Sequence, residues 1–259
     1  MSDPTVAQLF DLTGRVALIT GGSKGLGRSM ALGLAQAGAT TVLLSRHIEE
    51  ATRAAADLEA EAKRESLGLA GDVTVEAEVT RAVEAVVGKY GRLDVLINSA
   101  GINIRHAIEN FPPADFHRVV ETNLTGTWLC CRAVSRIMKE AKRGSVINVG
   151  SALSHVGLAE RTAYTAAKAG VLGMTRTLAL EWAAFGVRCN AICPGPFLTE
   201  MNRPLLAEPA KAAAVVGLTA VNRWAELHEI RGAAVFLASD ASTYVTGSAL
   251  DVDGGWTAK

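Results

Sequence analysis

Tyr164 and Lys168 are the pair of residues whose types and spacing best suit acid–base chemistry. They stand one helical turn apart in segment 163–185, which is predicted to be a helix, so their side chains share a face. A phenol ordinarily has a pKa of about 10, and a neighbouring ammonium lowers that pKa because it stabilises the phenolate. The pair therefore predicts a proton donor and acceptor that works near neutral pH. Taken alone, this spacing is more often an ordinary surface pair.

Polar residues at the ends of several expected strands favour the chemical interpretation. Ser151 follows segment 145–149, Asn98-Ser99-Ala100-Gly101 ends the fourth strand, and Pro194-Gly195-Pro196 ends the sixth. Asn123 lies on the apolar stripe of a long expected helix, where an amide needs a polar partner. Open α/β sheets bind ligands at the carboxyl ends of their strands. We therefore expect most of these residues to surround one site.

A glycine-rich turn, Thr20–Gly27, lies between the first expected strand and the first expected helix. Glycine lets the backbone turn sharply and approach a ligand, and a helix N-terminus offers free N–H groups to a phosphate. A plain strand-to-helix turn is the alternative, which this position disfavours. A P-loop fits poorly, because Arg28 stands where that motif needs lysine. We expect a phosphate site that includes Gly21, Ser23, Lys24, Gly25, Leu26 and Gly27.

The end of the second expected strand, Ser45-Arg46, indicates which dinucleotide binds. A dinucleotide fold usually carries Asp or Glu about 20 residues after its glycines, where the acid holds the NAD ribose. This sequence has Arg46 there instead, and Lys24 adds a second cation. Two cations suit a 2′-phosphate, because charge-assisted hydrogen bonds to phosphate are strong and a carboxylate would repel it. The sequence predicts NADP(H) rather than NAD(H), with solvated surface charges as the alternative.

Short apolar runs alternate with helical patterns along the whole chain. Such alternation predicts βαβ units and a parallel sheet, and right-handed crossovers place helices on both faces. We predict an α/β fold in which 1–259 is one doubly wound Rossmann-like domain with about seven strands. The Pro- and Ala-rich stretch 197–225 is predicted to be irregular and to form a substrate lid. The expected strands are 15–20, 40–44, 66–70, 93–97, 145–149, 187–193 and 249–252, and the expected helices lie near 26–38, 49–65, 75–87, 116–138, 163–185 and 226–237.

Composition excludes several classes of protein. Hydrophobic residues make up 49% of the 259 residues, which is enough for a core and excludes a disordered chain. The 26 Lys and Arg balance the 26 Asp and Glu, so nucleic-acid binding is not expected. No apolar run approaches the roughly 20 residues of a membrane span, and the start lacks a signal-peptide pattern. The four cysteines and five histidines have no metal-ligand spacing, so we expect reduced thiols, no metal and a cytoplasmic protein.

The glycine turn, the strand-end residues and the Ser, Tyr and Lys set together resemble the short-chain dehydrogenase/reductase family. The resemblance covers residues 12 to 256, and the turn has the pattern T-G-x-x-x-G-x-G. One departure is visible, because the family's usual Asn-Asn-Ala-Gly is Asn-Ser-Ala-Gly at 98–101. This departure puts a local strand contact at Ser99 in doubt and leaves the chemistry unaffected.

The resemblance implies a role for each matching residue. Tyr164 would donate and accept the proton, and Ser151 would hydrogen-bond the substrate oxygen. Lys168 would bind the nicotinamide ribose, and Asn123 would hold a water that links Lys168 to solvent. The implied cofactor contacts are Asp72 and Val73 with the adenine, Asn98, Ala100 and Gly101 on the adenosine side, and Pro194, Gly195 and Thr199 with the nicotinamide carboxamide.

Three further segments, 101–106, 222–224 and 251–256, are similar to gluconate 5-dehydrogenases within the family. The implied reaction interconverts a secondary alcohol and a ketone with NADP(H), for example gluconate and 5-ketogluconate. Arg105 or His106 would bind the carboxylate of such an acid, because a guanidinium pairs well with carboxylate oxygens. Surface charges on a loop explain both residues equally well.

Other functions stay open at this point. The glycine turn and the catalytic segment also resemble a 3-oxoacyl-[acyl-carrier-protein] reductase. Such an enzyme needs a basic patch for its acidic partner, and the neutral net charge gives such a patch little support. A non-catalytic NADP-binding sensor would not need the proton relay that this chain keeps. A serine hydrolase using Ser151 and His155 lacks the G-x-S-x-G elbow. Met201 and other apolar residues of 197–225 predict a partly apolar substrate pocket.

The oligomeric state is predicted from the family, which is usually tetrameric through the long helices after the fourth and fifth strands. Trp128, Leu178 and Trp182 are large apolar residues on these helices. They fit burial between subunits, although contacts inside one subunit would also explain them. The prediction is a homotetramer.

Overall fold

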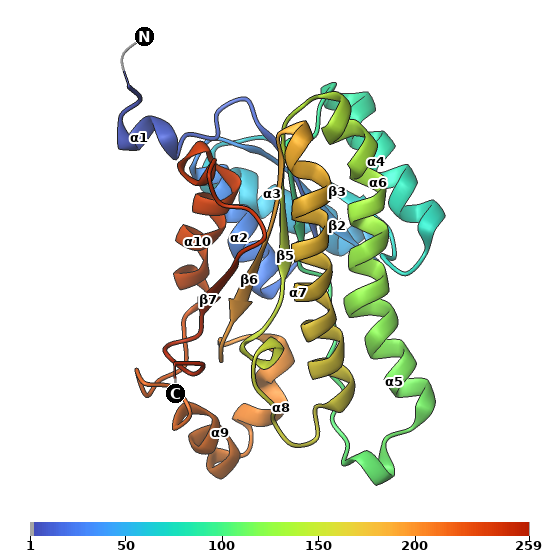
Figure 1. Ribbon diagram of the computed structural model, residues 1–259, viewed down its shortest axis with the longest axis vertical. Coiled ribbons are helices and arrows are strands. Elements are labelled where there is room, and N and C mark those ends of the chain that lie inside the picture. The colour runs from blue at the N-terminus through green and yellow to red at the C-terminus, as the bar shows by residue number, and fades with distance from the viewer. Residues whose placement is uncertain (1–2, 259) are drawn as a thin grey trace.

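Seven parallel strands form the sheet at the centre of the chain (Figure 1). The computed structural model describes residues 3–258. The central strands are short apolar runs that are buried along their length, as expected when helices cover both faces of a parallel sheet. Their order in the sheet is β3-β2-β1-β4-β5-β6-β7. The bounds are β1 Val16–Thr20, β2 Thr40–Ser45, β3 Ser66–Ala70, β4 Val95–Asn98, β5 Gly144–Val149, β6 Val187–Pro194 and β7 Ala249–Val252.

The strand order reverses between β1 and β4. On one side β1 pairs with β2, with Val16 opposite Thr40, and on the other side it pairs with β4, with Ala17 opposite Val95. The connections after β1 and β4 therefore leave in opposite directions, and a crevice forms at the carboxyl ends of these two strands. The glycine turn that follows β1 and the residues that follow β4 meet at this point.

Helices cover both faces of the sheet, which confirms the predicted doubly wound α/β fold (Figure 1). One core layer contains Met30 and Leu58, and the opposite layer contains Val83, Val134 and Trp182. The helices of the first face are α2 Gly25–Gln36, α3 Ile48–Ala62 and α10 Arg231–Ala238, and those of the second are α4 Glu76–Tyr90, α6 Gly126–Glu140 and α7 Thr162–Trp182.

One wider turn interrupts the long helix that the sequence predicts over 116–138. The structure has α5 at Pro113–Val120, a π-helical turn η2 at Glu121–Thr125, and then α6. The apolar stripe continues across the break, so the sequence pattern gave no sign of it. Asn123 lies in the wider turn and is fully buried. Turns of this kind are frequent at functional sites.

The irregular segment predicted over 197–225 contains two short helices, α8 Arg203–Leu206 and α9 Pro209–Val216. Each has a proline in its first turn, where the missing N–H costs no hydrogen bond, and α9 is rich in alanine, the best helix former. Both lie beyond the carboxyl end of β6 (Figure 1). The other short elements are α1 Val6–Leu9, η1 Ile108–Asn110, η3 Ala152–Ser154, η4 Ala183–Phe185, η5 Glu200–Asn202, η6 Leu227–Ile230 and η7 Asp240–Ser242. Within residues 3–258, no helix combines the length and apolar character that crossing a membrane requires.

Candidate active site

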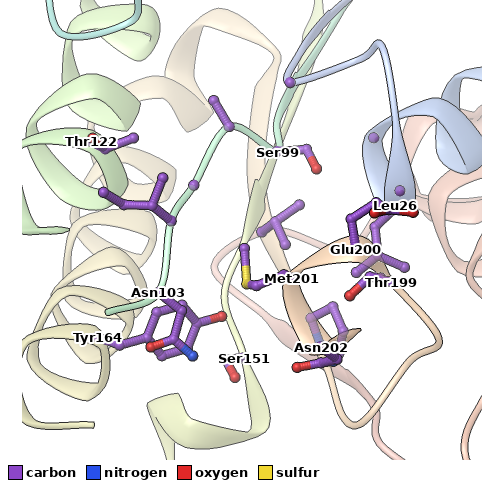
Figure 2. Close-up of a pocket in the computed structure, with 18 of the residues that line it drawn as sticks. Leu26, Ser99, Asn103, Thr122, Ser151, Tyr164, Thr199, Glu200, Met201 and Asn202 are labelled. Carbon is purple, nitrogen blue, oxygen red and sulfur yellow. The ribbon is translucent and has the colours of Figure 1, made fainter. Parts of the chain in front are cut away.

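A cavity of about 870 Å³ collects the residues at the carboxyl ends of the strands. Its walls come from the turns after β1, β4, β5 and β6, from α7 and from segment 197–225. Figure 2 shows Tyr164 and Ser151 beside one another at this cavity, with Asn103 next to them. The predicted site residues that line it are Gly21, Ser23, Lys24, Gly25, Leu26, Gly27, Ser45, Arg46, Asp72, Val73, Ala100, Gly101, Arg105, Ser151, Tyr164, Lys168, Pro194, Gly195, Thr199 and Met201.

The glycine turn is shaped by close backbone contacts on one side and open space on the other. A Cβ at Gly21 would lie 2.9 Å from the backbone of Ala100, and a Cβ at Gly27 would lie 2.3 Å from the carbonyl oxygen of Gly21. Gly25 has a φ of +58° and only Thr199 within 4 Å of its Cβ position. The turn therefore packs against the end of β4 while the N-terminus of α2 faces the cavity. This geometry fits a dinucleotide phosphate.

The predicted 2′-phosphate site lies where β2 ends. Lys24, Ser45 and Arg46 all line the cavity, and the Ser23 hydroxyl donates a 3.3 Å hydrogen bond to that of Ser45. The structure adds one acid that sequence spacing did not connect with this place. The first turn of α3 brings Glu50 to 4.0 Å from the Lys24 ammonium. Arg46 is exposed and therefore free to turn toward a phosphate.

On the adenine side, Asp72 is held by its own turn. Its carboxylate accepts hydrogen bonds from the backbone N–H and hydroxyl of Thr74, at 2.9 and 2.8 Å. Its backbone N–H donates to Glu78 at 2.8 Å. Val73 packs against Gly126 at the start of α6, where a Cβ would lie 2.8 Å from the valine side chain. Both Asp72 and Val73 are therefore fixed at the cavity wall.

Asn98 lies outside the cavity lining, and its side chain contacts the neighbouring strand β5 behind the cavity wall. Its side-chain amide donates a 2.9 Å hydrogen bond to Asn148 of β5. The next residues are tied to the glycine turn, because Thr20 Oγ1 accepts from the backbone N–H groups of Ser99 and Ala100, both at 3.1 Å. The hydrogen bond from its own backbone N–H to the Thr20 hydroxyl thus fixes Ser99, the position that departs from the family pattern.

Lys168 is a buried lysine at the end of the cavity next to β5. Its ammonium donates a 2.6 Å hydrogen bond to the carbonyl oxygen of Val149 and lies 5.7 Å from the centroid of the Tyr164 ring. Burial lowers the pKa of Lys168 to about 8. A lysine with this pKa can exchange a proton near neutral pH.

The Tyr164 phenol has a raised pKa, in contrast to the lowering expected from its lysine neighbour. Burial raises this pKa because it disfavours the phenolate, while the Ser151 hydroxyl and the charges of Arg105 and Arg161 lower it. Lys168 is not among the groups that shift this pKa, and its ammonium bonds to the β5 backbone instead of the phenol. The chain's own groups thus stabilise the protonated phenol.

Asn123 is the buried amide that the sequence predicts to need a polar partner, and its partner is the backbone of Ile102. Its side-chain oxygen accepts from the Ile102 N–H at 2.8 Å, and its amide donates to the Ile102 carbonyl at 2.9 Å. Gly101 approaches both Asn123 and Lys168, at 3.1 and 3.8 Å from its Cβ position. Asn123 therefore lies behind the cavity wall and positions the loop after β4.

The three predicted substrate residues separate into two groups. Arg105 and Met201 line the cavity, and an Arg105 guanidinium nitrogen lies 3.4 Å from the Met201 carbonyl oxygen. His106 lies outside the lining. Its ring packs edge-on against Phe111 and its Nε2 lies 3.5 Å from the Asp115 carboxylate. Of Arg105 and His106, the two residues predicted to bind a carboxylate, only Arg105 is placed to contact a ligand in the cavity.

Sequence reasoning missed several cavity residues. Arg161 and Asn103 line the cavity near Tyr164, and Asn103 is drawn beside the tyrosine in Figure 2. Arg161 stands less than one helical turn before Tyr164, which was the available signal. Asn103 lies two residues before Arg105, in the loop already singled out.

The structure also brings together His155, Cys193 and Asp251, which the sequence spacing did not connect. Their ligand atoms lie within 4.8 Å of one another. His155 and Asp251 already form a 3.1 Å pair, and burial raises the pKa of the Cys193 thiol to about 12. A metal would need the thiolate, which this environment disfavours. Among residues 3–258, the hydrogen bonds of the Ser151 hydroxyl do not include His155, as a hydrolase would require; the hydroxyl accepts from the Leu153 N–H at 3.1 Å.

The strand order and the cavity at its reversal point are those of a dinucleotide-binding fold. Comparison with known proteins gives the family. A family model described as enoyl-(acyl carrier protein) reductase matches residues 21–257. The chain belongs to the short-chain dehydrogenase/reductase family and is an NADP-dependent oxidoreductase that acts on CH–OH groups.

Individual relatives are similar along nearly the whole chain. The D-threitol dehydrogenase of Mycolicibacterium smegmatis is 39% identical over 96% of this chain and 95% of its own. The gluconate 5-dehydrogenase of Gluconobacter oxydans is 38% identical over 99% of each chain. A solved gluconate 5-dehydrogenase from Burkholderia cenocepacia, in complex with NADP and tartrate, has a TM-score of 0.95 at 36% identity and covers 98% of this chain and 100% of its own. The NADP in that structure agrees with the cofactor predicted from Ser45-Arg46.

Proposed function

We propose that the chain is an NADP(H)-dependent dehydrogenase that interconverts a secondary alcohol and a ketone, with a sugar acid such as gluconate and its 5-keto form as the substrate pair. One observation carries this proposal. A single cavity joins the glycine turn and Arg46 at one end to Tyr164, Ser151 and Lys168 at the other. The cofactor site and the proton-transfer groups are therefore parts of one site.

The residues at the glycine turn fit NADP(H). The open side of Gly25 and the free end of α2 accommodate phosphates, and Lys24 and Arg46 add the positive charge that a 2′-phosphate needs. When bound, the cofactor supplies the hydride chemistry. The protein holds it between the glycine turn and the turn that begins at Pro194.

Tyr164 is the proposed proton donor to the ketone and acceptor from the alcohol. Ser151 lies beside it and would hold the substrate oxygen by a hydrogen bond, so that the carbinol carbon faces the cofactor. Lys168 would bind the nicotinamide ribose, and its buried ammonium would exchange the proton with solvent. Asn123 would support this exchange through the loop that it fixes at Ile102. An oxidised, positively charged nicotinamide would lower the Tyr164 pKa toward neutrality.

Segment 197–225 is the proposed substrate lid. Thr199, Met201, Leu205 and Val215 from this segment line the cavity, and Phe197 pairs with Ala225 across an isolated parallel bridge. The two ends of the segment are thus joined while its middle reaches over the substrate end. Such an arrangement would exclude water from the reacting atoms.

Two other functions remain as alternatives to the proposed dehydrogenase. A 3-oxoacyl-[acyl-carrier-protein] reductase is supported by the relative of that name from Synechocystis sp., which is 37% identical over 94% of this chain and 97% of its own. A non-catalytic NADP sensor would bind cofactor without turnover, and the complete set of Tyr164, Ser151 and Lys168 at one cavity counts against it.

The test is a steady-state assay of NADPH oxidation and NADP⁺ reduction. The panel contains 5-ketogluconate, gluconate, threitol and a 3-oxoacyl thioester. The proposal expects the highest kcat/KM with the gluconate pair. A preference for the thioester would support the reductase, and NADPH binding without any turnover would support the sensor.

A further inference from the structure

Arg161 is a buried cation, and the acid paired with it within residues 3–258 is the exposed Glu160. The Arg161 side chain is 8% exposed. Among residues 3–258, its hydrogen bonds use Nη1 alone and reach the carbonyl oxygens of Ala159 and Glu160, at 3.4 and 3.2 Å. The Glu160 carboxylate lies 3.8 Å away and is 56% exposed, so water competes for it. Burying an arginine without a closely bonded carboxylate is costly.

A second guanidinium, that of Arg105, lines the same cavity. Its Nε is buried and has no hydrogen-bond partner, and its Nη2 makes only long contacts of 3.4 Å with Met201 and Asn202. The two cations also act on each other, because burial and then the charge of Arg105 lower the pKa of Arg161 to about 10. The carboxylates of Glu160 and Glu208 also act on Arg105, but both are more than half exposed, so a buried anion would offset the repulsion between the two guanidiniums more strongly.

The surroundings add to the positive potential. Arg161 is the N-cap of α7, and its side chain makes no capping hydrogen bond. Because Arg161 lines the cavity, the positive end of this long helix lies at the cavity too. The buried oxygen of the Asn103 side chain lacks a donor. Asn103 and Tyr164 both line the cavity (Figure 2), and the Asn103 oxygen would accept a hydrogen bond from a hydroxyl group of a ligand there.

We infer that Arg161 and Arg105 together bind the carboxylate of a polyhydroxy acid, with Asn103 accepting a hydrogen bond from one of its hydroxyl groups. Arg161 is a specificity-determining residue, and it selects an acid over a neutral polyol of the same length. The inference rests on the proposed function for the reacting end of the substrate, because the charged end would fix which carbinol carbon faces Tyr164 and Ser151. The backbone contacts of Arg161 use one nitrogen and leave the others for the anion.

The test measures binding without turnover, on protein saturated with NADPH, because an alcohol cannot be oxidised by the reduced cofactor. Calorimetry compares gluconate with gluconamide, and tartrate with its diamide, so that each pair has nearly the same size and the amide lacks the negative charge. The wild type is expected to bind at least one acid more tightly than its amide. Arg161→Met should weaken binding of that acid by about 10- to 100-fold and leave the amide unchanged.

Matched variants separate binding from folding. Arg176→Met removes an exposed arginine from the same helix and should keep the wild-type preference for the acid. Arg161→Lys should keep part of it, because the charge remains without the planar fork. Thermal unfolding and NADPH affinity show whether Arg161→Met folds. If it does not fold, Arg105→Met and Arg161→Lys test the anion site in its place. Each should weaken binding of the acid selectively.

An Arg161→Met protein that folds and binds the acids as the wild type does would overturn the inference. So would a wild type that binds each acid no better than its amide. The proposed function fails separately: a wild type that prefers gluconate over gluconamide but oxidises no alcohol with NADP⁺ retains the anion site and lacks the reaction.

Discussion

The ammonium of Lys168 lies 5.7 Å from the centroid of the Tyr164 ring and bonds to the β5 backbone at Val149. The two residues are thus neighbours through space, and the lysine is held by a carbonyl oxygen rather than by the phenol. Burial raises the pKa of Tyr164 and lowers the pKa of Lys168 to about 8. Both shifts favour the uncharged forms, so a negative charge on the phenol needs a further cation, which oxidised cofactor would supply.

The Lys168 shift predicts how stability depends on pH. Below pH 8 both the folded and the unfolded protein hold the lysine proton, and the folded state bears the full cost of the buried charge. Between about pH 8 and 10.5 the folded protein loses this proton while the unfolded chain keeps it, so stability rises with pH. Relative to Lys168→Met, the wild type should gain up to about 3 kcal/mol across this interval. Chemical denaturation of cofactor-free protein measures the difference, and a pH-independent difference would contradict the assignment.

Arg46 is predicted to select NADPH over NADH. Arg46→Ala should raise the KM for NADPH by about 10- to 100-fold, because it removes a charge-assisted phosphate contact, and should leave the KM for NADH nearly unchanged. Arg53→Ala is the matched control, since Arg53 is an exposed arginine of α3 outside the cavity lining. Equal effects on the two cofactors would place the 2′-phosphate elsewhere.

Asn123 is predicted to be a positioning residue for the loop after β4. Asn123→Leu keeps the size of the side chain but leaves the buried N–H and carbonyl of Ile102 without partners. The free energy of unfolding should fall by about 2–4 kcal/mol, and kcat should fall more than NADPH affinity. Asn110→Leu, at an exposed position, should change neither quantity. A stable Asn123→Leu protein would show that the loop holds its shape without this amide.

We propose that the chain forms a homotetramer through α6 and α7. Trp182 is core, but Trp128 is 45% exposed and Leu180 83% exposed, so these helices keep large apolar residues at the surface. Trp128→Lys should reduce the mass measured by light scattering, while Val6→Lys, on the distant α1, should leave it unchanged. A wild-type monomer at micromolar concentration would refute the proposal.

The sequence predicted the sheet well because its central strands, such as β1 and β4, are short apolar runs that are buried along their length. The edge strands β3 and β7 are only partly buried, and the alternation of strands with helical patterns identified them. The glycine turn was found because its residues are adjacent in the chain. Ser151, Tyr164 and Lys168 were found because the spacing and the family resemblance both single them out. These features depend on local sequence, which is why they could be read without the structure.

Features that depend on contacts across the chain could not be read in this way. The π-helical turn at Asn123 lies in an apolar stripe that continues through it, and the hydrogen-bonding partner of Asn123 is the backbone of Ile102 in another loop. The pKa of Tyr164 was expected to fall, but the burial that raises it is visible only in three dimensions. Glu50 beside Lys24 and the buried Arg161 likewise become apparent once the helices are in place.

The account depends most directly on the Tyr164 hydroxyl, and Tyr164→Phe tests it. This variant removes one oxygen and keeps the ring, so NADPH affinity and thermal stability should stay near wild type. The kcat for reduction of 5-ketogluconate, or of the best substrate found in the panel, should fall by at least about 100-fold. Turnover within a few-fold of the wild type, in a variant that binds NADPH normally, would contradict the assignment of Tyr164 as the proton donor.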